Sequence, residues 1–263
     1  MSMIIGKALI AGGGTVDRLD FTYTGQYNER LEDGVVELLS TGILKVKRNV
    51  SVDVFLVGGG SAGGSCRTSV SSGGGGAGGH TKTFSVTLYT DTEYHIEVGA
   101  GGAHNTGYGV GGAGGSTSAF GATVNGGSAG ARYSVGANGG SGGGGAEGGA
   151  GGSDGSNGSN GSSSAASINP GGTGQGITTR EFGEATGKLY AGGGSAGNFS
   201  SSATATPGGA GGGGDGGDRT KAPTAGSENT GGGGGGGSAV SSSTMLGADG
   251  GSGIVCIRLH KEA

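Results

Sequence analysis

The sequence predicts an all-β protein: a β-sandwich of jelly-roll type that carries inserted glycine-rich helices of the extended kind, with almost no α-helix. Three observations lead to this prediction. Short segments of alternating apolar and polar residues recur along the chain and close it at the C-terminal end. Glycine supplies 75 of the 263 residues, and 68 of these lie between Gly58 and Gly253, whereas ordinary domains contain roughly 7% glycine. No segment has a helical period, and glycine at this density opposes a helix.

The first 34 residues are the least regular part of the chain. The segment 21–24 (FTYT) alternates and predicts a short strand, and the three glycines at 12–14 predict a break between two weaker strands. We expect residues 1–34 to be an N-terminal arm or attachment segment. Residues 35–263 are then one glycine-rich domain.

Strand patterns become regular after residue 35. Apolar residues occupy every second position, as in Val52, Val54 and Leu56, which share one face of a strand. The strands at 84–88 and 94–98 alternate in the same way, with one buried and one wet face. The polar residues at 90–92 predict a turn, and hence a hairpin between the strands on either side. The expected strands are 35–39, 43–47, 52–56, 84–88, 94–98, 119–124, 188–191 and 254–259.

The glycine runs predict helices of the polyproline II type. Runs lie at 73–76, 142–145, 211–214 and 231–237, and between 149 and 161 every third residue is Gly. A polyproline II helix has three residues per turn and no internal hydrogen bonds, so its N–H and C=O groups must pair with neighbouring helices. Collagen is excluded because a strict period and abundant proline are absent. Such a composition also marks disorder, but the strands that interrupt and close the glycine region favour an ordered lattice.

Between the glycine runs lie islands that hold most of the large side chains of this region. In a lattice these islands become the loops at its ends, and loops on a rigid scaffold are where binding residues concentrate. The alternative is that they are mere connectors whose aromatic rings fill the sandwich. The candidates for a receptor-binding surface are Tyr108, Arg132, Tyr133, Phe199, Arg219 and Lys221.

Composition excludes several partners. The net charge is −4 with 13% charged residues, and there is no basic run, so we expect no nucleic-acid partner. No apolar run approaches the roughly 18–20 residues of a membrane span, so we expect no membrane insertion. The N-terminus lacks a signal-peptide pattern, which favours synthesis in a bacterial cytoplasm. Cys66 and Cys256 are too few for a disulfide scaffold. We expect two thiols, and a bridge between them stays open.

Motifs for chemistry are absent or accidental. Residues 58–63 fit G-x-G-x-x-G, but no helix pattern follows, as a dinucleotide site requires. The four histidines are scattered singly, and the aspartates beside glycine lack the nine-residue period of calcium-binding repeats. We therefore expect no catalytic residue, no metal and no cofactor.

Several stretches resemble the glycine-rich domain family found in tail proteins of phages and prophages. They read LLSTGILKV, VDVFLVGGG, GGGGAGGHTKTFSV, YHIEVGAGG, GGAGGSTSAFGATVNGG, GQGITTREFGEATGKLYAGGG and the closing GGSGIVCIR. The resemblance covers about residues 35–263. The layout is also similar to the glycine-rich region of the anaplastic lymphoma kinase receptor, although this chain lacks its many cysteines. That likeness implies a tumour-necrosis-factor-like sandwich with a bundle of polyproline II helices.

The resemblance implies a non-enzymatic tail-fibre or tail-tip protein. Its expected partners are a glycan or protein receptor on a bacterial surface, and other tail proteins that contact the N-terminal segment. The expected location is the virion, and the choice between a homotrimer and a monomer stays open. The alternatives are a purely structural virion component (a spacer, cap or decoration) and, less favoured because the islands are irregular, an ice-binding protein.

Overall fold

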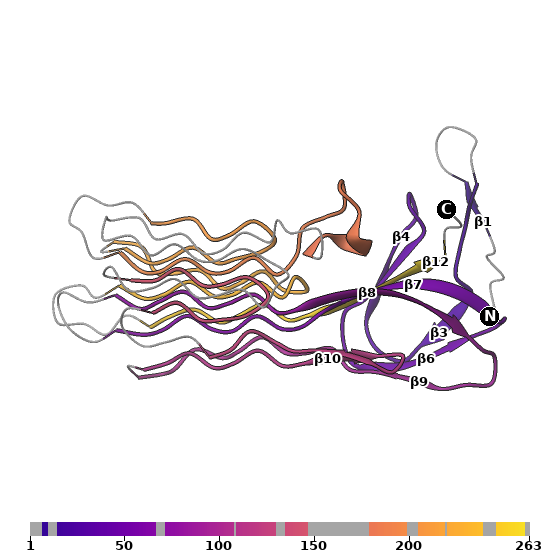
Figure 1. Ribbon diagram of the computed structural model, residues 1–263, viewed down its shortest axis with the longest axis horizontal. Coiled ribbons are helices and arrows are strands. Elements are labelled where there is room, and N and C mark those ends of the chain that lie inside the picture. Colours follow the sequence, from indigo (N-terminus) through magenta and orange to yellow (C-terminus); the bar gives the residue numbers. More distant parts are fainter. Residues whose placement is uncertain are drawn as a thin grey trace.

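The molecule is elongated, with β-sheets at one end and a long bundle of extended segments at the other (Figure 1). The computed structural model describes the backbone of residues 7–9 and 15–17, and the residues 18–66, 72–107, 109–129, 135–146, 179–198, 205–218, 220–238 and 246–260. Helical backbone in this part of the chain is confined to 3-10 turns at and beside η2 (Glu181–Gly183). The predicted all-β class with almost no helix is thus confirmed.

The described strands form two main sheets and two small hairpins, all antiparallel. One sheet has the order β4 (Tyr27–Arg30), β5 (Val35–Leu38), β12 (Ile254–Leu259), β7 (Val50–Val57), β8 (Thr81–Leu88). The other has the order β3 (Phe21–Tyr23), β6 (Gly42–Val46), β9 (Tyr94–Ile96). The hairpins are β1 (Lys7–Leu9) with β2 (Thr15–Asp17), and β10 (Thr117–Ala119) with β11 (Ala122–Val124). The closing strand β12 lies between β5 and β7, so the chain returns to its first strands after the glycine region.

The two sheets enclose one hydrophobic cluster, which contains buried residues from both. Val52, Val54 and Leu56 of β7 lie in it, as their alternation predicts. The intervening Phe55 and Val57 point to the opposite face of the same sheet, where Phe182 and Tyr190 cover them. The centre of the five-stranded sheet is therefore buried on both faces, because the chain segment around η2 packs over its outer side.

The pairing expected for the strands at 84–88 and 94–98 is wrong. β8 pairs with β7, and β9 pairs with β6, so the two strands belong to different sheets. Leu88 and Ile96 still reach the same core, from opposite sides. Alternation determines which face of a strand is buried but not which strand lies beside it, and the turn at 90–92 crosses from one sheet to the other.

Two further expected strands, 119–124 and 188–191, do not form as the sequence predicts. Residues 119–124 form a hairpin instead of one strand, because Phe120 and Gly121 have φ angles of 51° and 79°, as both central residues of a tight two-residue turn require. Residues 188–191 form no strand. Leu189 makes a single bridge with Arg180, and the φ of 55° at Ala191 turns the chain away from extended geometry.

The N-terminal boundary expected at residue 34 does not coincide with an edge of the sheets. β3 pairs with β6, and β4 pairs with β5 over four residues. Leu19 is 6% exposed and lies in the main cluster. Residues 19–30 are therefore built into the two sheets, whereas β1 and β2, the described strands before them, form a separate hairpin.

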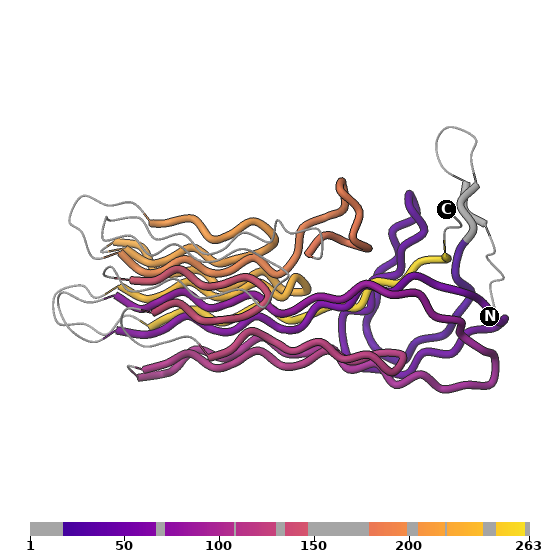
Figure 2. The backbone as a smooth tube through the Cα atoms, in the orientation of Figure 1, coloured from indigo at the N-terminus to yellow at the C-terminus, as the bar shows by residue number. Residues whose placement is uncertain are grey.

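Beyond the sheets, segments from widely separated parts of the chain lie side by side in the bundle (Figure 2). Residues 58–65, which continue β7, bond to three neighbours in turn, and each neighbour recurs at every third residue. The N–H groups of Gly58, Ser61 and Gly64 donate to the first neighbour, at the carbonyls of His80, Ala77 and Gly74 respectively. Those of Gly59, Ala62 and Ser65 donate to the second, at Gly115, Gly112 and Gly109. Those of Gly60 and Gly63 donate to the third, at Gly251 and Ala248, and all eight N···O distances are 2.9 to 3.0 Å. This threefold pattern satisfies the buried backbone without a β-ladder.

Glycine is required in the bundle because the backbones touch. A Cβ on Gly60 would lie 2.0 Å from the carbonyl oxygen of Gly232, and a Cβ on Gly63 would lie 2.1 Å from that of Gly235. Between them, Ser61 and Ala62 carry side chains and are fully buried. The Ser61 Oγ accepts a hydrogen bond from the Ala77 N–H at 2.8 Å. The segment 149–161, where every third residue is Gly and a polyproline II helix is predicted, lies outside the described residues.

Candidate functional site

Only one of the six predicted receptor-binding residues lies in the described part of the chain. Tyr108, Arg132, Tyr133, Phe199 and Arg219 lie outside it. Lys221 is exposed, and its Nζ lies 3.8 Å from an Asp215 carboxylate oxygen. Gly217, four residues earlier, donates a hydrogen bond to the Gly236 carbonyl oxygen. The run 231–237 begins beside Ser252, just before β12, so Gly236 lies toward the end of the bundle that is farthest from the sheets.

The turn that carries Lys221 is built around Asp218. The Oδ1 of Asp218 accepts hydrogen bonds from the Thr220 N–H and the Lys221 N–H, both at 2.7 Å, and from the Thr220 hydroxyl at 2.8 Å. Burial alone would raise the pKa of Asp218, but these bonds lower it overall. The turn is therefore held in one shape by a carboxylate that stays charged.

Hydrogen bonds from buried serine hydroxyls connect segments at the same end of the bundle. Ser65 Oγ accepts from the Gly247 N–H at 3.0 Å and donates to the Asn105 carbonyl at 3.3 Å. Ser238 Oγ donates to the Asn198 carbonyl at 2.8 Å. These bonds join segments that are far apart in sequence into a hydrogen-bonded rim.

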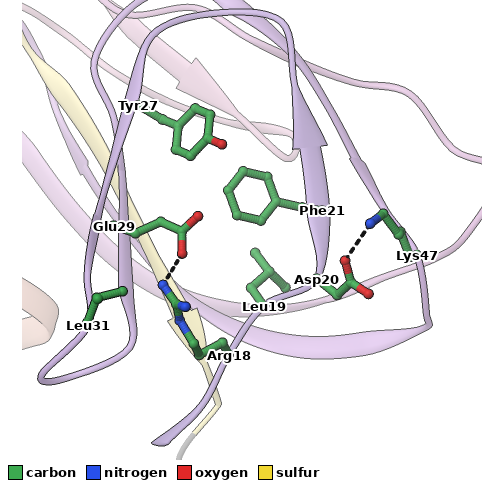
Figure 3. A pocket seen from close by; sticks show the side chains of 8 residues that line it. All are labelled: Arg18, Leu19, Asp20, Phe21, Tyr27, Glu29, Leu31 and Lys47. Carbon is green, nitrogen blue, oxygen red and sulfur yellow. Dashed lines mark hydrogen bonds and ion pairs between the residues drawn. The ribbon is translucent and has the colours of Figure 1, made fainter. Parts of the chain in front are cut away.

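A pocket at the other end of the molecule has no counterpart in the sequence prediction. It opens between β3 and β4, the edge strands of the two sheets, and has a volume of about 420 Å³ (Figure 3). Its lining residues are Arg18, Leu19, Asp20, Phe21, Tyr27, Glu29, Leu31 and Lys47. Residues 27–31 (YNERL) show no regular alternation of apolar and polar residues, so a sequence pattern could not indicate that Tyr27 and Glu29 face Phe21.

The pocket combines rings with paired charges. Phe21 and Tyr27 meet edge to face, with ring centroids 5.2 Å apart. Arg18 bonds to Glu29 on one side, and the Lys47 Nζ lies 2.8 Å from an Asp20 carboxylate oxygen on the other (Figure 3). Tyr27 and Leu31 are both 46% exposed, so apolar surface is open to solvent beside four charged groups.

A third polar cluster is buried beneath the segment around η2. The Arg30 guanidinium lies 2.7 Å from a Glu181 carboxylate oxygen, and the Tyr190 hydroxyl donates to the other oxygen at 3.2 Å. The same hydroxyl lies 3.7 Å from the Cys256 sulfur. Burial raises the pKa of the Cys256 thiol and that of Tyr190, so both groups stay neutral. The cluster attaches the η2 segment to the five-stranded sheet and offers no activated nucleophile.

Asp53 holds a neighbouring charge cluster at the end of β12. Its carboxylate lies 2.5 Å from the His260 Nδ1 and 3.4 Å from the Arg258 Nε, and Ser85 donates to it at 2.7 Å. Arg258 also lies 2.7 Å from a Glu184 carboxylate oxygen. Burial alone would raise the pKa of Asp53, but the bonds from His260, Ser85 and Arg258 lower it overall.

This lowered pKa predicts a loss of stability in acid. The unfolded pKa of an aspartate is about 3.9, so Asp53 stabilises the fold above that pH, and the contribution is lost as pH falls through the lower folded pKa. We expect the unfolding midpoint in denaturant to fall between about pH 5 and pH 2. The fall should be smaller in Asp53→Asn, which is less stable at neutral pH. An equal acid dependence in both proteins would contradict the assignment.

The described residues give no sign of a metal centre or a membrane span. Within them, no three His, Cys, Asp or Glu side chains are grouped as metal ligands would be. In the same part of the chain, no helix has the length and apolar character needed to cross a membrane. Cys66 and Cys256 are both buried and are not bridged to each other.

Comparison with known proteins gives one match. No curated protein is similar enough to match this chain. The sequence profile of the family described as "Glycine-rich domain" matches residues 40–260, which include most of both sheets and the whole described bundle. The protein therefore belongs to the glycine-rich domain family.

Proposed function

We propose that this protein is a non-enzymatic tail-fibre or tail-tip protein of a phage or prophage. It acts as an adhesin that contacts a glycan or protein on a bacterial surface. The observation that supports the proposal most is how the end of the bundle remote from the sheets is built. The Asp218 turn and the Ser65 and Ser238 rim lie together at the end remote from the sheets, and loops on a rigid support are favoured places for binding.

We infer further that the bundle is a lattice of polyproline II helices. The recurrence of each hydrogen-bonded neighbour at every third residue of 58–65 supports this, because a polyproline II helix has three residues per turn and makes no internal hydrogen bonds. We also infer that the two sheets form a sandwich of the jelly-roll or tumour-necrosis-factor type. One core enclosed by two antiparallel sheets supports that inference.

A bundle of this kind suits an adhesin for a physical reason. Its backbones are fixed by hydrogen bonds at about 2.9 Å, and its side chains contribute little to the packing. The loops can therefore differ in sequence without disturbing the interior, and a preformed support lowers the entropy lost on binding. In the proposed virion, the N-terminal segment contacts other tail proteins while the bundle points to the cell.

The proposal is tested by replacing the predicted contact residues. Tyr108→Ala, Tyr133→Ala and Phe199→Ala are combined in one variant, and the binding of the labelled protein to a panel of bacterial cells is measured. We expect the variant to bind at least about tenfold more weakly, because aromatic anchors dominate most interfaces. Tyr89→Ala is the matched control, since Tyr89 is 56% exposed and lies at the sheet end.

Two results would overturn the adhesin assignment. One is that the unchanged protein binds no bacterium of the panel. The other is that the triple variant binds as well as the unchanged protein. A tail that fails to assemble when the gene is deleted, while its loop variant still adsorbs normally, would favour the purely structural alternative.

A further inference from the structure

We propose that the pocket between β3 and β4 binds a neutral saccharide of one or two pyranose rings. The pocket is distinct from the loops of the proposed function, because it lies at the sheet end and its lining residues come from 18–31 and Lys47. The proposal rests on three observations: the charges of the pocket compensate one another, an aromatic ring in it is fixed and partly exposed, and its volume suits a small sugar.

The charges of the pocket predict an uncharged ligand. Arg18 is paired with Glu29, and Lys47 is paired with Asp20, so the four ionic groups sum to zero (Figure 3). An anion or a cation in the pocket would have to break one of these pairs. A neutral polyol does not, because a carboxylate in a single ion pair keeps free lone pairs, and a guanidinium keeps further N–H donors. The pocket thus offers donors and acceptors side by side.

The aromatic ring of Tyr27 supplies the apolar part of the contact. Its neighbours are Phe21, at 5.2 Å, and Tyr23, at 6.3 Å, and both meet it edge to face. Tyr23 is itself fixed, since its hydroxyl donates to the Ser40 carbonyl and burial raises its pKa to about 12. A ring held from two sides while 46% of Tyr27 stays exposed is preorganised to stack on the apolar face of a sugar.

The base of the pocket and its volume also suit a small sugar. Leu19, at the base of the pocket, belongs to the main hydrophobic cluster, so the bound face of a ligand would meet packed core and not mobile chain. The volume of about 420 Å³ is at the lower end of the range of roughly 300–1,000 Å³ that small-ligand sites occupy. This favours one or two sugar rings over a longer oligosaccharide.

The experiment uses saturation-transfer NMR with the full chain. The probes are glucose, galactose, mannose, rhamnose, N-acetylglucosamine and their β-linked disaccharides, with sialic acid and glucosamine as charged comparisons. We expect at least one neutral probe to bind in the millimolar range, and Tyr27→Ala to weaken it roughly tenfold. Tyr89→Ala is the matched control and should bind as the unchanged protein does.

The polar part of the site is tested by comparing substitutions of two lysines, Lys45 in β6 and Lys47 just after it. Lys47→Met removes the partner of Asp20 in the pocket, whereas Lys45→Met removes an exposed pair with Glu93 outside it. We expect only Lys47→Met to weaken binding. Thermal unfolding of each variant shows whether it is folded, and the loop variant with changes at 108, 133 and 199 should keep its binding to the sugar.

Three results would overturn the proposal. They are no binding by any neutral probe, binding only by the charged probes, and binding that folded Tyr27→Ala retains in full. The loop variant is expected to bind sugars normally. A failure of the adhesin assignment therefore appears in the cell-binding assay, whereas a failure of the pocket proposal appears in the sugar-binding assay.

Discussion

Gly60→Ala is expected to lower the thermal unfolding midpoint by roughly 6 to 12 °C, measured by calorimetry. The added methyl group would lie 2.0 Å from the Gly232 carbonyl oxygen and 2.4 Å from its carbon. Neither atom belongs to a flexible side chain, so two backbones must separate. The cost of overpacking is about 3 kcal/mol, and each kilocalorie shifts the midpoint of a protein of this size by about 2 to 4 °C.

The control for this substitution is Gly107→Ala. Among the described residues other than its chain neighbours, the only atom within 4 Å of its new methyl group would be the Asn105 Oδ1, at 3.6 Å, which is ordinary contact. Alanine also restricts the unfolded chain more than glycine does, so we expect an unchanged or slightly higher midpoint. If Gly60→Ala were as stable as Gly107→Ala, the close packing of the bundle described here would be wrong.

Arg30→Met is expected to destabilise the protein by about 3 kcal/mol in denaturant unfolding. Arg30 is the cation beside Glu181, whose side chain is 7% exposed, and its other carboxylate neighbours are Glu37 and Asp33. Burial would lower the pKa of Arg30, but the hydrogen bond and charge of Glu181 raise it overall. Without the guanidinium, Glu181 keeps its burial but loses its cation. We expect the η2 segment to become more accessible to protease.

Two variants separate this effect from a general loss of charge. Lys45→Met removes one partner of a pair whose side chains are both 52% exposed, and its midpoint should stay nearly unchanged because solvent screens such pairs. Glu181→Gln combined with Arg30→Met should recover part of the lost stability, since residue 181 is then no longer a buried charge without a cation. Equal losses in Arg30→Met and Lys45→Met would show that the buried pair has no special role.

The sequence predicted the sheets where local alternation was decisive. Val52, Val54 and Leu56 face the core as expected, because the period of two marks a buried face. Strand partners could not be predicted in the same way, since β8 and β9 have clear patterns but bond to β7 and β6. The turn at Phe120 could not be predicted, because its positive φ is unusual for a phenylalanine and no residue type in the sequence indicates it.

The candidate sites were less predictable than the strands. Reasoning from large side chains among glycines selected Lys221, which does lie at the far end of the bundle. It missed the pocket at Tyr27, because that pocket forms where the edges of two sheets meet and depends on tertiary contact alone. The buried pair of Arg30 and Glu181 was equally invisible, since 151 residues separate its members.

The hydrogen bonds of residues 58–65 have one more consequence, for how this kind of molecule can change in length. Each neighbour meets the segment again only after three residues. Adding or removing one or two residues would turn the following N–H groups toward the wrong neighbours and bring Ser61 or Ala62 to places where only glycine fits. Three residues restore every partner. The bundle therefore lengthens or shortens in steps of three residues, and all segments that share a level must change together.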